Sequence, residues 1–227
     1  MLDGMKDGDY FVDLFCGGCN LLDSVPNNLR RIANDKNEYL IEMWKALTSG
    51  WEPKTTISRE TYNLARKCCN EHNHGPLSMA EIGWIIFMAS VNGKFLGGYS
   101  GHNVKIGNGK TRDYISESIR NIQKQIPLLD GVDFHYGNYD ELELPPVGKT
   151  TIYCDIPYKD TTKYTTSKNF DYDKFYGWCR QKHSEGYRLY ISEYQMPDDF
   201  KCVWEKQITC AMNQTTTKKP FEKLFTL

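Results

Sequence analysis

The hydrophobic pattern of the chain alternates between short apolar runs and segments with helical spacing. Residues 10–15 form an apolar run typical of a buried strand, and this run leads directly into the turn Cys16-Gly17-Gly18-Cys19. Residues 30–35 predict a second strand that ends on a carboxylate, and residues 38–47 carry apolar side chains at the spacing of a helix. This order predicts an α/β fold.

The rest of the chain continues the pattern. Residues 58–70 and 78–89 predict helices, because each begins with a serine followed two or three positions later by a glutamate, as at a helix N-cap. Six glycines make residues 91–111 typical of irregular structure, before a helical pattern resumes over 112–125. The remaining expected elements are strands at 133–136, 150–155, 188–192, 202–210 and 222–226 and a helix at 171–185. This ending predicts a mixed sheet closed by an antiparallel hairpin.

Composition and charge limit the class of protein. A chain of 227 residues with 40% hydrophobic and 25% charged residues can form one sizeable core and a small subdomain. It contains neither an apolar run long enough to span a membrane nor the apolar centre of a signal peptide, so we expect a cytoplasmic protein with reduced cysteines. Because the net charge is -1, contact with nucleic acid requires a local basic patch.

Small and polar residues gather where the predicted strands end. Gly17 and Gly18 allow the backbone to approach a ligand closely, although a tight turn without a ligand also explains the pair. Asp35 stands where nucleotide-binding α/β folds grip ribose hydroxyls, with a helix N-cap as the alternative. Asn138 follows the strand at 133–136 and can hydrogen-bond an adenine ring at the same sheet edge, with a turn as the alternative.

The most informative motif is Asp155-Ile156-Pro157-Tyr158, in which a strand ends in an acid, a proline-fixed turn and an aromatic ring. An amino group conjugated to a ring is a weak nucleophile, so its alkylation requires hydrogen-bond acceptors that favour the tetrahedral nitrogen. The Asp155 carboxylate and the Ile156 carbonyl can be these acceptors. Pro157 restricts the direction of that carbonyl, and Tyr158 offers a flat face for an extruded base.

These motifs resemble those of the Dam-like (D12 class) DNA adenine N6-methyltransferases, especially the small phage and prophage members. The resemblance covers residues 10–227 and is also carried by Ala33-Asn34-Asp35-Lys36-Asn37, Gly97-Gly98-Tyr99-Ser100-Gly101, Ile191-Ser192-Glu193-Tyr194 and Glu222-Lys223-Leu224-Phe225. It implies a Rossmann-like class I AdoMet-dependent methyltransferase fold and double-stranded DNA as substrate. It also implies S-adenosylmethionine (AdoMet) as methyl donor, S-adenosylhomocysteine as product, and a bacterial host or phage as the source, including restriction-modification systems.

The resemblance implies site residues as well. The predicted cofactor site comprises Asp13, Phe15, Cys16, Gly17, Gly18, Asn20, Asp35, Lys36, Asn138, Tyr139 and Asp155. The predicted catalytic residues, which contact a flipped target adenine, are Asp155, Ile156, Pro157 and Tyr158. No metal site is expected, because Cys68, Cys69, His72 and His74 lack a second, distant pair of ligands.

The surplus of residues between the two halves of the fold predicts an inserted, mostly helical target-recognition subdomain. We expect this insertion at 51–125, between catalytic segments 1–50 and 126–227. Residues 94–124 hold six basic against two acidic side chains, which favours contact with phosphates, although an ordinary solvated loop is the alternative. The predicted DNA-binding residues are Lys94, Tyr99, His102, Asn103, Lys105, Lys110, Arg112, Lys163 and Tyr164.

Two features depart from the family's pattern. Ile156 replaces the first proline of the commoner tetrapeptide, but its carbonyl is retained. The Gly-Ser-Lys or Gly-Gly-Lys segment that helps to hold the methionyl end of AdoMet is not found before Tyr10, so a partner, another segment or an upstream start would supply it, or cofactor binding is weak. The alternative functions are a non-catalytic AdoMet- or DNA-binding relative and a methyltransferase acting on cytosine N4 or a protein amide.

Overall fold

The structure is a computed structural model that describes residues 1–159, 170–207 and 221–227. The chain divides into two compact units. The first unit comprises Met1–Cys16, Val25–Lys36 and Gly137–Leu227, and the second comprises Gly17–Ser24 and Asn37–Tyr136. The second unit therefore contains all of the predicted insertion together with residues on either side of it.

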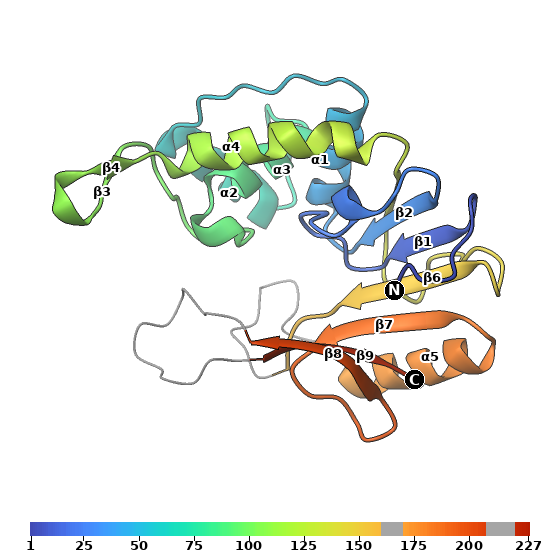
Figure 1. Cartoon of the computed structure of the whole chain (residues 1–227). Coiled ribbons are helices and arrows are strands. Elements are labelled where there is room, and N and C mark those ends of the chain that lie inside the picture. The colour runs from blue at the N-terminus through green and yellow to red at the C-terminus, as the bar shows by residue number, and fades with distance from the viewer. Residues whose placement is uncertain (160–169, 208–220) are drawn as a thin grey trace. The chain divides into compact units, whose positions relative to one another are not determined.

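The first unit is built on a mainly parallel sheet (Figure 1). Its strands are β1 (Tyr10–Asp13), β2 (Arg30–Asp35), β6 (Thr150–Asp155), β7 (Arg188–Glu193), β8 (Lys201–Gln207) and β9 (Phe221–Thr226). They lie in the order β2-β1-β6-β7-β9-β8, with β9 antiparallel to both of its neighbours and the other pairings parallel. This arrangement confirms the predicted mixed α/β sheet. Residues 208–220, between β8 and β9, lie outside the described residues, so the closing hairpin stays a prediction.

Apolar side chains in the central strands form the core of this unit. Val12, Ile152 and Leu189 occupy neighbouring positions on β1, β6 and β7, and all three are buried. The helix α5 (Tyr172–Ser184) packs Phe175 and Cys179 into the same cluster. Central parallel strands that are covered on their faces read as continuous apolar runs, which is why the sequence predicts them well.

The second unit is mainly helical (Figure 1). Its helices are α1 (Glu38–Thr48), α2 (Arg59–Asn70), α3 (Met79–Ala89) and α4 (Tyr114–Gln125). Short 3-10 turns are η1 (Leu22–Ser24), η2 (Val91–Gly93), η3 (Gly107–Gly109) and η4 (Ile126–Leu129), and short strands are β3 (Val104–Lys105), β4 (Thr111–Arg112) and β5 (Asp133–Tyr136). Within the described residues, no helix has the length and apolar character needed to cross a membrane.

The helix starts follow the capping residues in the sequence. Ser58 caps α2, and Ser78 caps α3 in a reciprocal capping box with Glu81. Both helices were predicted from these serines. The helix expected from residue 112 instead begins at Tyr114, because the side chain of Asp113 accepts a hydrogen bond from the Ser116 N–H at 2.9 Å and so caps α4.

Residues 91–111, predicted to be irregular, contain a short antiparallel hairpin. Val104 pairs with Arg112, and Lys105 pairs with Thr111. The hairpin extends beyond the start of α4 (Figure 1). Strands of two residues leave too few positions for an alternating pattern, which explains why periodicity did not reveal them.

Candidate active site

The sheet of the first unit reverses its winding between β1 and β6. From β1 the chain continues to β2 on one side, and from β6 it continues to β7 on the other side. In open α/β sheets, ligands bind outside the carboxyl ends of the strands at such a switch point. Asp13 ends β1 and Asp155 ends β6, so the two predicted motifs lie on neighbouring strand ends.

A cavity of about 390 Å³ lies at the carboxyl end of β1 in the same unit. This volume lies within the range of small-molecule and cofactor pockets. Its lining residues are Leu14, Phe15, Lys36, Gly137, Asn138, Tyr139, Asp140, Phe170, Asp171 and Lys174. Four of them, Phe15, Lys36, Asn138 and Tyr139, were predicted to contact the cofactor.

Aromatic rings form the apolar part of this cavity. The rings of Phe15 and Tyr139 stack with their centroids 5.6 Å apart, and Phe170 packs edge-on against Phe15 at 5.9 Å. The charged part includes an ion pair of 2.6 Å between Lys174 Nζ and the Asp140 carboxylate. Flat apolar surfaces beside hydrogen-bonding groups suit a ligand that combines an aromatic ring with polar substituents.

Asn34 fixes the backbone beside the cavity. Its buried side-chain amide donates hydrogen bonds to the carbonyl of Leu14 at 3.2 Å and to the carbonyl of Gly137 at 3.1 Å. One side chain thus joins the end of β1 to the turn that begins at Gly137. The sequence placed Asn34 in a family motif, but this bridging role was missed because its two partners are distant in the chain.

Asn138 lies in a turn, which was the alternative considered for it. Its backbone N–H and its side-chain amide donate to the two carboxylate oxygens of Glu141 at 3.0 and 2.9 Å. The turn nevertheless places Asn138 in the lining of the cavity. The two interpretations of Asn138, as a turn residue and as a ligand contact, are therefore compatible, because a turn residue can also present polar groups to a ligand.

The other predicted cofactor residues of the first unit, Asp13, Cys16, Asp35 and Asp155, are not part of the cavity lining. Helix α1 is capped by Asn37, so Asp35 does not have the capping role considered for it. Gly17, Gly18 and Asn20 belong to the second unit, where the Gly17 carbonyl accepts a hydrogen bond from the Trp44 indole at 3.0 Å.

Asp13 is a buried acid beside the cavity residue Phe15. Burial raises its pKa well above the usual value, although the Phe15 N–H donates to its carboxylate at 3.3 Å and favours ionisation. The negative charges of Asp155 and Asp35 raise the pKa of Asp13 further. Negative charges at Asp155 and Asp35 that oppose ionisation of Asp13 create a region in which a bound cation would be favoured.

The tetrapeptide turn is held by hydroxyl groups on both sides. Tyr158 forms a side-chain hydrogen bond with Asp155, and Tyr172 of α5 donates its hydroxyl hydrogen to the Pro157 carbonyl at 2.7 Å. The Tyr158 ring also packs edge-on against Tyr194 at 4.8 Å. Within the part of the chain that the structure describes, no group donates a hydrogen bond to the Ile156 carbonyl. With respect to these residues, the carbonyl keeps its acceptor capacity.

The surroundings of Asp155 make it a weaker acid than usual. The residue as a whole is exposed, but protein atoms packed around the carboxyl restrict its hydration and raise its pKa to about 6. The charges of Glu222 and Glu193 act in the same direction, and the hydrogen bond from Tyr158 acts against them. Asp155 is therefore mostly ionised at neutral pH.

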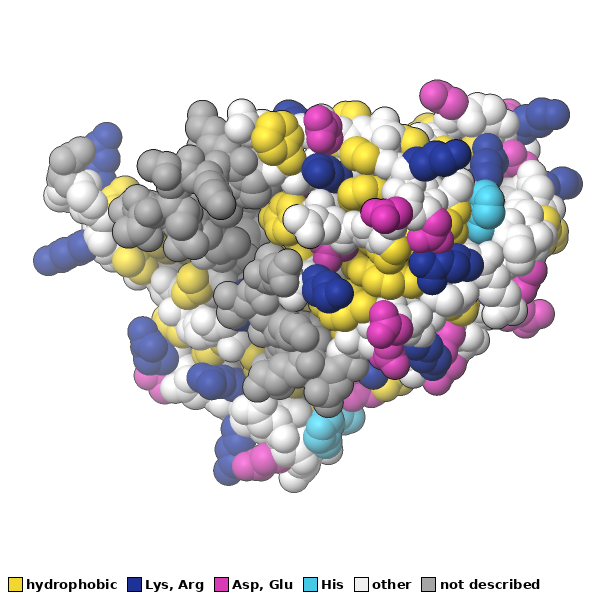
Figure 2. Space-filling model, turned by 90° about the horizontal axis from the view of Figure 1, so that it is seen from below, with side chains coloured by type: hydrophobic (Ala, Val, Ile, Leu, Met, Phe, Trp, Pro, Cys, Tyr) yellow, Lys and Arg dark blue, Asp and Glu magenta, His cyan; other side chains and the backbone are white. Residues whose placement is uncertain are grey.

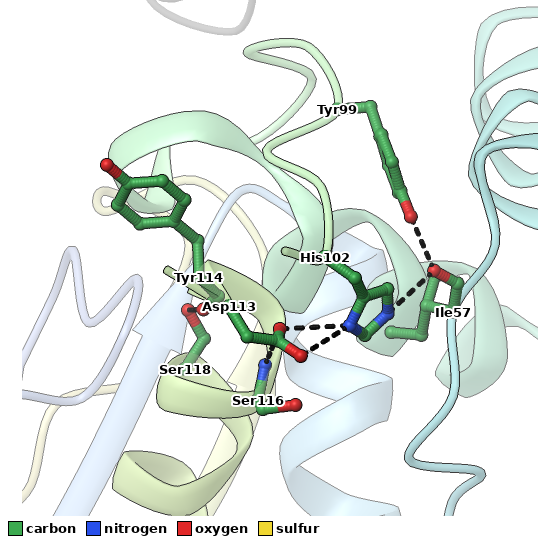
Figure 3. Close-up of polar contacts among 7 residues, drawn as sticks. All are labelled: Ile57, Tyr99, His102, Asp113, Tyr114, Ser116 and Ser118. Atoms are coloured by element: carbon green, nitrogen blue, oxygen red, sulfur yellow. Dashed lines mark hydrogen bonds and ion pairs between the residues drawn. The ribbon is translucent and has the colours of Figure 1, made fainter. Parts of the chain in front are cut away.

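Two of the predicted DNA-binding residues form contacts inside the second unit. The Tyr99 hydroxyl donates to the Ile57 carbonyl at 2.8 Å. The His102 ring lies between Asp113 and the same carbonyl, with Nδ1 at 2.9 Å from both Asp113 oxygens and Nε2 at 3.2 Å from the Ile57 oxygen (Figure 3). These contacts attach the segment before the β3–β4 hairpin to the start of α4, through Asp113, and to Ile57, which precedes α2. A role of Tyr99 and His102 in reading DNA stays a prediction.

The basic residues on the β3–β4 hairpin differ in whether they form contacts within the chain. Arg112 forms a bidentate pair with Glu117 at 2.7 to 3.0 Å and lies over the Tyr114 ring, whereas Lys105 and Lys110 are exposed on the hairpin. Asn103 is also exposed, with a left-handed backbone conformation. Lys163 and Tyr164 lie outside the described residues. Figure 2 shows basic side chains interspersed with acidic ones on the face it draws, as expected for a net charge near zero.

Metal ligands do not converge in the described parts of either unit. No group of three or more His, Cys, Asp or Glu side chains among residues 1–159, 170–207 and 221–227 is arranged to hold an ion. Cys68 and Cys69 are buried free thiols near the end of α2, and Cys69 interacts with the Tyr39 hydroxyl. The cysteine pair therefore contributes to packing.

Comparison with known proteins agrees with the motifs. A family model described as D12 class N6 adenine-specific DNA methyltransferase matches residues 2–73. This segment contains the turn after β1 and Asp35, and it ends before the tetrapeptide. No curated protein matches the chain. The match confirms the resemblance to the D12 class, whose described activity is adenine-specific DNA methylation, over residues 2–73.

Proposed function

We propose that this chain, whose amino-terminal part matches the D12 class, is a DNA adenine-N6 methyltransferase that uses AdoMet and acts on an adenine flipped out of the duplex. The observation that carries this proposal is the pairing of β1 with β6. It brings a cofactor-sized cavity at the end of one strand next to the acid-and-carbonyl acceptor pair at the end of the other.

Residues around the cavity would hold the nucleoside part of the cofactor. Phe15 and Tyr139 offer flat faces to an adenine ring, and Asn138 offers an amide. Asp35 would accept hydrogen bonds from the ribose hydroxyls. The mutually repelling acids Asp13 and Asp155 favour a cationic ligand nearby, which suits a sulfonium. Gly17, Gly18 and Asn20 remain predicted contacts on the strength of their motif.

The tetrapeptide would act on the target amine. AdoMet held there would supply the methyl group, with S-adenosylhomocysteine as the product. The Asp155 carboxylate and the Ile156 carbonyl accept hydrogen bonds from the two amino hydrogens, so that the nitrogen lone pair is directed toward the methyl carbon. Asp155, ionised above about pH 6, receives the proton that the nitrogen loses. Tyr158 stacks on the extruded base.

The second unit would supply target recognition. Lys105 and Lys110 on the hairpin, together with Lys94 and Arg112, would contact phosphates, and Asn103 offers an amide that can read base edges. The boundary of the insertion at 51–125 and the contributions of Lys163 and Tyr164 are part of this proposal.

Transfer of label from AdoMet to DNA tests the proposal. The purified chain is incubated with methyl-labelled AdoMet and mixed-sequence duplex DNA, and the DNA is then digested to nucleosides. We expect label in N6-methyladenosine. Label in N4-methylcytosine or in protein would identify a different acceptor, and binding of AdoMet without any transfer would identify a non-catalytic relative.

Substitution of Tyr139 tests the cavity. Tyr139→Leu keeps apolar bulk but removes the flat face, so we expect AdoMet to bind about tenfold more weakly, as for the loss of one stacking contact. Equilibrium dialysis with labelled AdoMet measures the effect. The matched control is Tyr136→Leu, because Tyr136 is 57% exposed and does not line the cavity. Equal affinities for the two variants would place the cofactor elsewhere.

A further inference from the structure

Glu193, the last residue of β7, is a buried carboxylate that forms no ion pair within residues 1–159, 170–207 and 221–227. Its exposed fraction is 2%, and none of the described lysine, arginine or histidine side chains forms an ion pair with it. Burial of a carboxylate is costly unless hydrogen bonds replace its lost hydration. Neighbouring hydrogen-bond donors must therefore replace the lost hydration of the Glu193 carboxylate.

Two backbone N–H groups satisfy it. The Lys159 N–H donates to Oε1 of Glu193 at 2.6 Å, and the Tyr194 N–H donates to Oε2. Hydrogen bonds from N–H groups to an ionised carboxylate are among the stronger ones in proteins. One side chain thus joins the residue that follows the tetrapeptide to the residue that follows β7.

Both of these residues are next to Tyr158. Lys159 follows Tyr158 in the chain, and Tyr194 packs its ring against the Tyr158 ring at 4.8 Å. The register of the two strands explains why Glu193 can reach them. Ser192 lies opposite Asp155, so Glu193, the next residue of β7, extends beyond the end of β6, where the turn begins.

We propose, on the basis of the proposed methyltransferase function, that Glu193 is a positioning residue for the tetrapeptide turn. Its carboxylate holds the main chain at Lys159, which follows Tyr158, and at Tyr194, whose ring packs against Tyr158, while the Tyr172 hydroxyl holds the Pro157 carbonyl. The Ile156 carbonyl lies one peptide before the held Pro157 carbonyl and is thereby kept in one direction. Preorganised acceptors act in catalysis only when their direction is fixed before the reaction.

The charge of Glu193 also affects Asp155. The groups that influence the Asp155 carboxyl come from several elements: Glu193 on β7, Glu222 on β9, Tyr158 in the turn and Asp13 on β1. Removal of the negative charge at position 193 or 222 lowers the pKa of Asp155. The acidic limb of the pH profile of kcat/KM, which we expect near pH 6, then moves to lower pH. A residue that only stabilised the fold would not move this limb.

Three glutamate-to-glutamine variants separate positioning from charge. Glu193→Gln removes the charge and keeps one acceptor for two N–H groups, so we expect kcat to fall about tenfold and the acidic limb to shift, with AdoMet affinity changed less than about twofold. Glu222→Gln should shift the limb in the same direction with a smaller loss of kcat, since no hydrogen bond among the described residues joins Glu222 to the turn. Glu185→Gln, an exposed position at the end of α5, should change neither.

Amide hydrogen exchange tests the geometry without turnover. In Glu193→Gln and Glu193→Ala, we expect the amides of Lys159 and Tyr194 to exchange about tenfold faster than in the parent chain, while those of β1 and β6 keep their rates. Unchanged exchange at both amides, or an unchanged kcat in Glu193→Gln, would overturn the positioning role. If the parent chain transfers no methyl group to DNA, the proposed function fails, and the exchange rates still decide whether Glu193 holds the turn.

Discussion

Replacement of Asp155 by alanine is expected to lower kcat/KM for DNA methylation by about 1000-fold, which is the effect of removing one preorganised group that stabilises developing charge. The variant loses the acceptor at the end of β6 but keeps the Ile156 carbonyl. Asp155→Asn keeps an acceptor oxygen and should retain more activity. Initial rates of labelled methyl transfer give kcat when DNA is saturating and kcat/KM when DNA is limiting.

The pH dependence of Asp155→Asn distinguishes the charge from the shape of the side chain. In the parent chain, kcat/KM should fall tenfold for each pH unit below about 6, because the carboxyl, whose pKa is raised chiefly by burial, becomes protonated. This limb should be absent in Asp155→Asn. The control is Asp199→Asn, which breaks an exposed pair with Arg180 and should keep the parental profile. An unshifted limb in Asp155→Asn would assign the titration to another group.

Asp155→Asn should lower activity, but it should not lower the stability of the folded chain at neutral pH. The pKa of Asp155 is about 6 in the folded chain against an ordinary value of 3.8, so the folded state binds its proton more tightly. The stability linked to this group is therefore present at low pH and is lost as the pH rises from about 4 to 6. At pH 7, Asp155→Asn should unfold at a denaturant concentration at least as high as the parent chain. A lower midpoint would indicate a structural role for the carboxylate.

Gly83→Ala is expected to destabilise the second unit by about 3 kcal/mol, the upper part of the range for overpacked cores. Gly83 lies within α3, and a Cβ built on it would stand 2.1 Å from the Tyr39 carbonyl oxygen and 2.8 Å from the Tyr39 carbonyl carbon, both in the backbone of α1. A backbone atom cannot move aside as the end of a flexible side chain can. The two helices would have to separate, with loss of the packing around Met43.

A second helical glycine provides the control for this effect. Gly177 lies within α5, and a Cβ at this position would meet no atom within 4 Å. Gly177→Ala should therefore stabilise the chain by about 1 kcal/mol, which is the difference in helix propensity. Denaturant unfolding of the two variants measures the expected loss of stability in Gly83→Ala and the expected gain in Gly177→Ala. A neutral Gly83→Ala would mean that α1 and α3 do not approach as closely as the structure describes.

The acidic groups at the strand ends connect the fold to the chemistry. Asp13, Asp155 and Glu193 end β1, β6 and β7, three neighbouring parallel strands. The charge of Asp155 opposes ionisation of Asp13, and the charge of Glu193 opposes ionisation of Asp155. Such a cluster opposes folding when no cation is bound. For a site that binds a sulfonium and an amine that gains positive charge, the same cluster favours the ligand and the transition state.

Local patterns in the sequence were sufficient for most of the secondary structure. The apolar run before Cys16 predicted β1, and Ser58 and Ser78 predicted the starts of α2 and α3 through the hydrogen bonds that they make. The tetrapeptide could be predicted as a candidate site because an acid, a proline and an aromatic ring in succession serve no common packing need. The error at the start of α4 arose because Asp113 was not recognised as its cap.

The sequence by itself determined which segments become strands and helices and which chemical groups stand at strand ends, because periodicity, capping and turn chemistry act between residues a few positions apart. Only the tertiary structure decided that Phe15 stacks on Tyr139, that Asn34 bridges Leu14 and Gly137, and that Glu193 binds the Lys159 N–H. These contacts join residues up to 124 positions apart in the numbering. They depend on strand order and register, which follow from the packing of the whole sheet and leave no periodic signal in the chain.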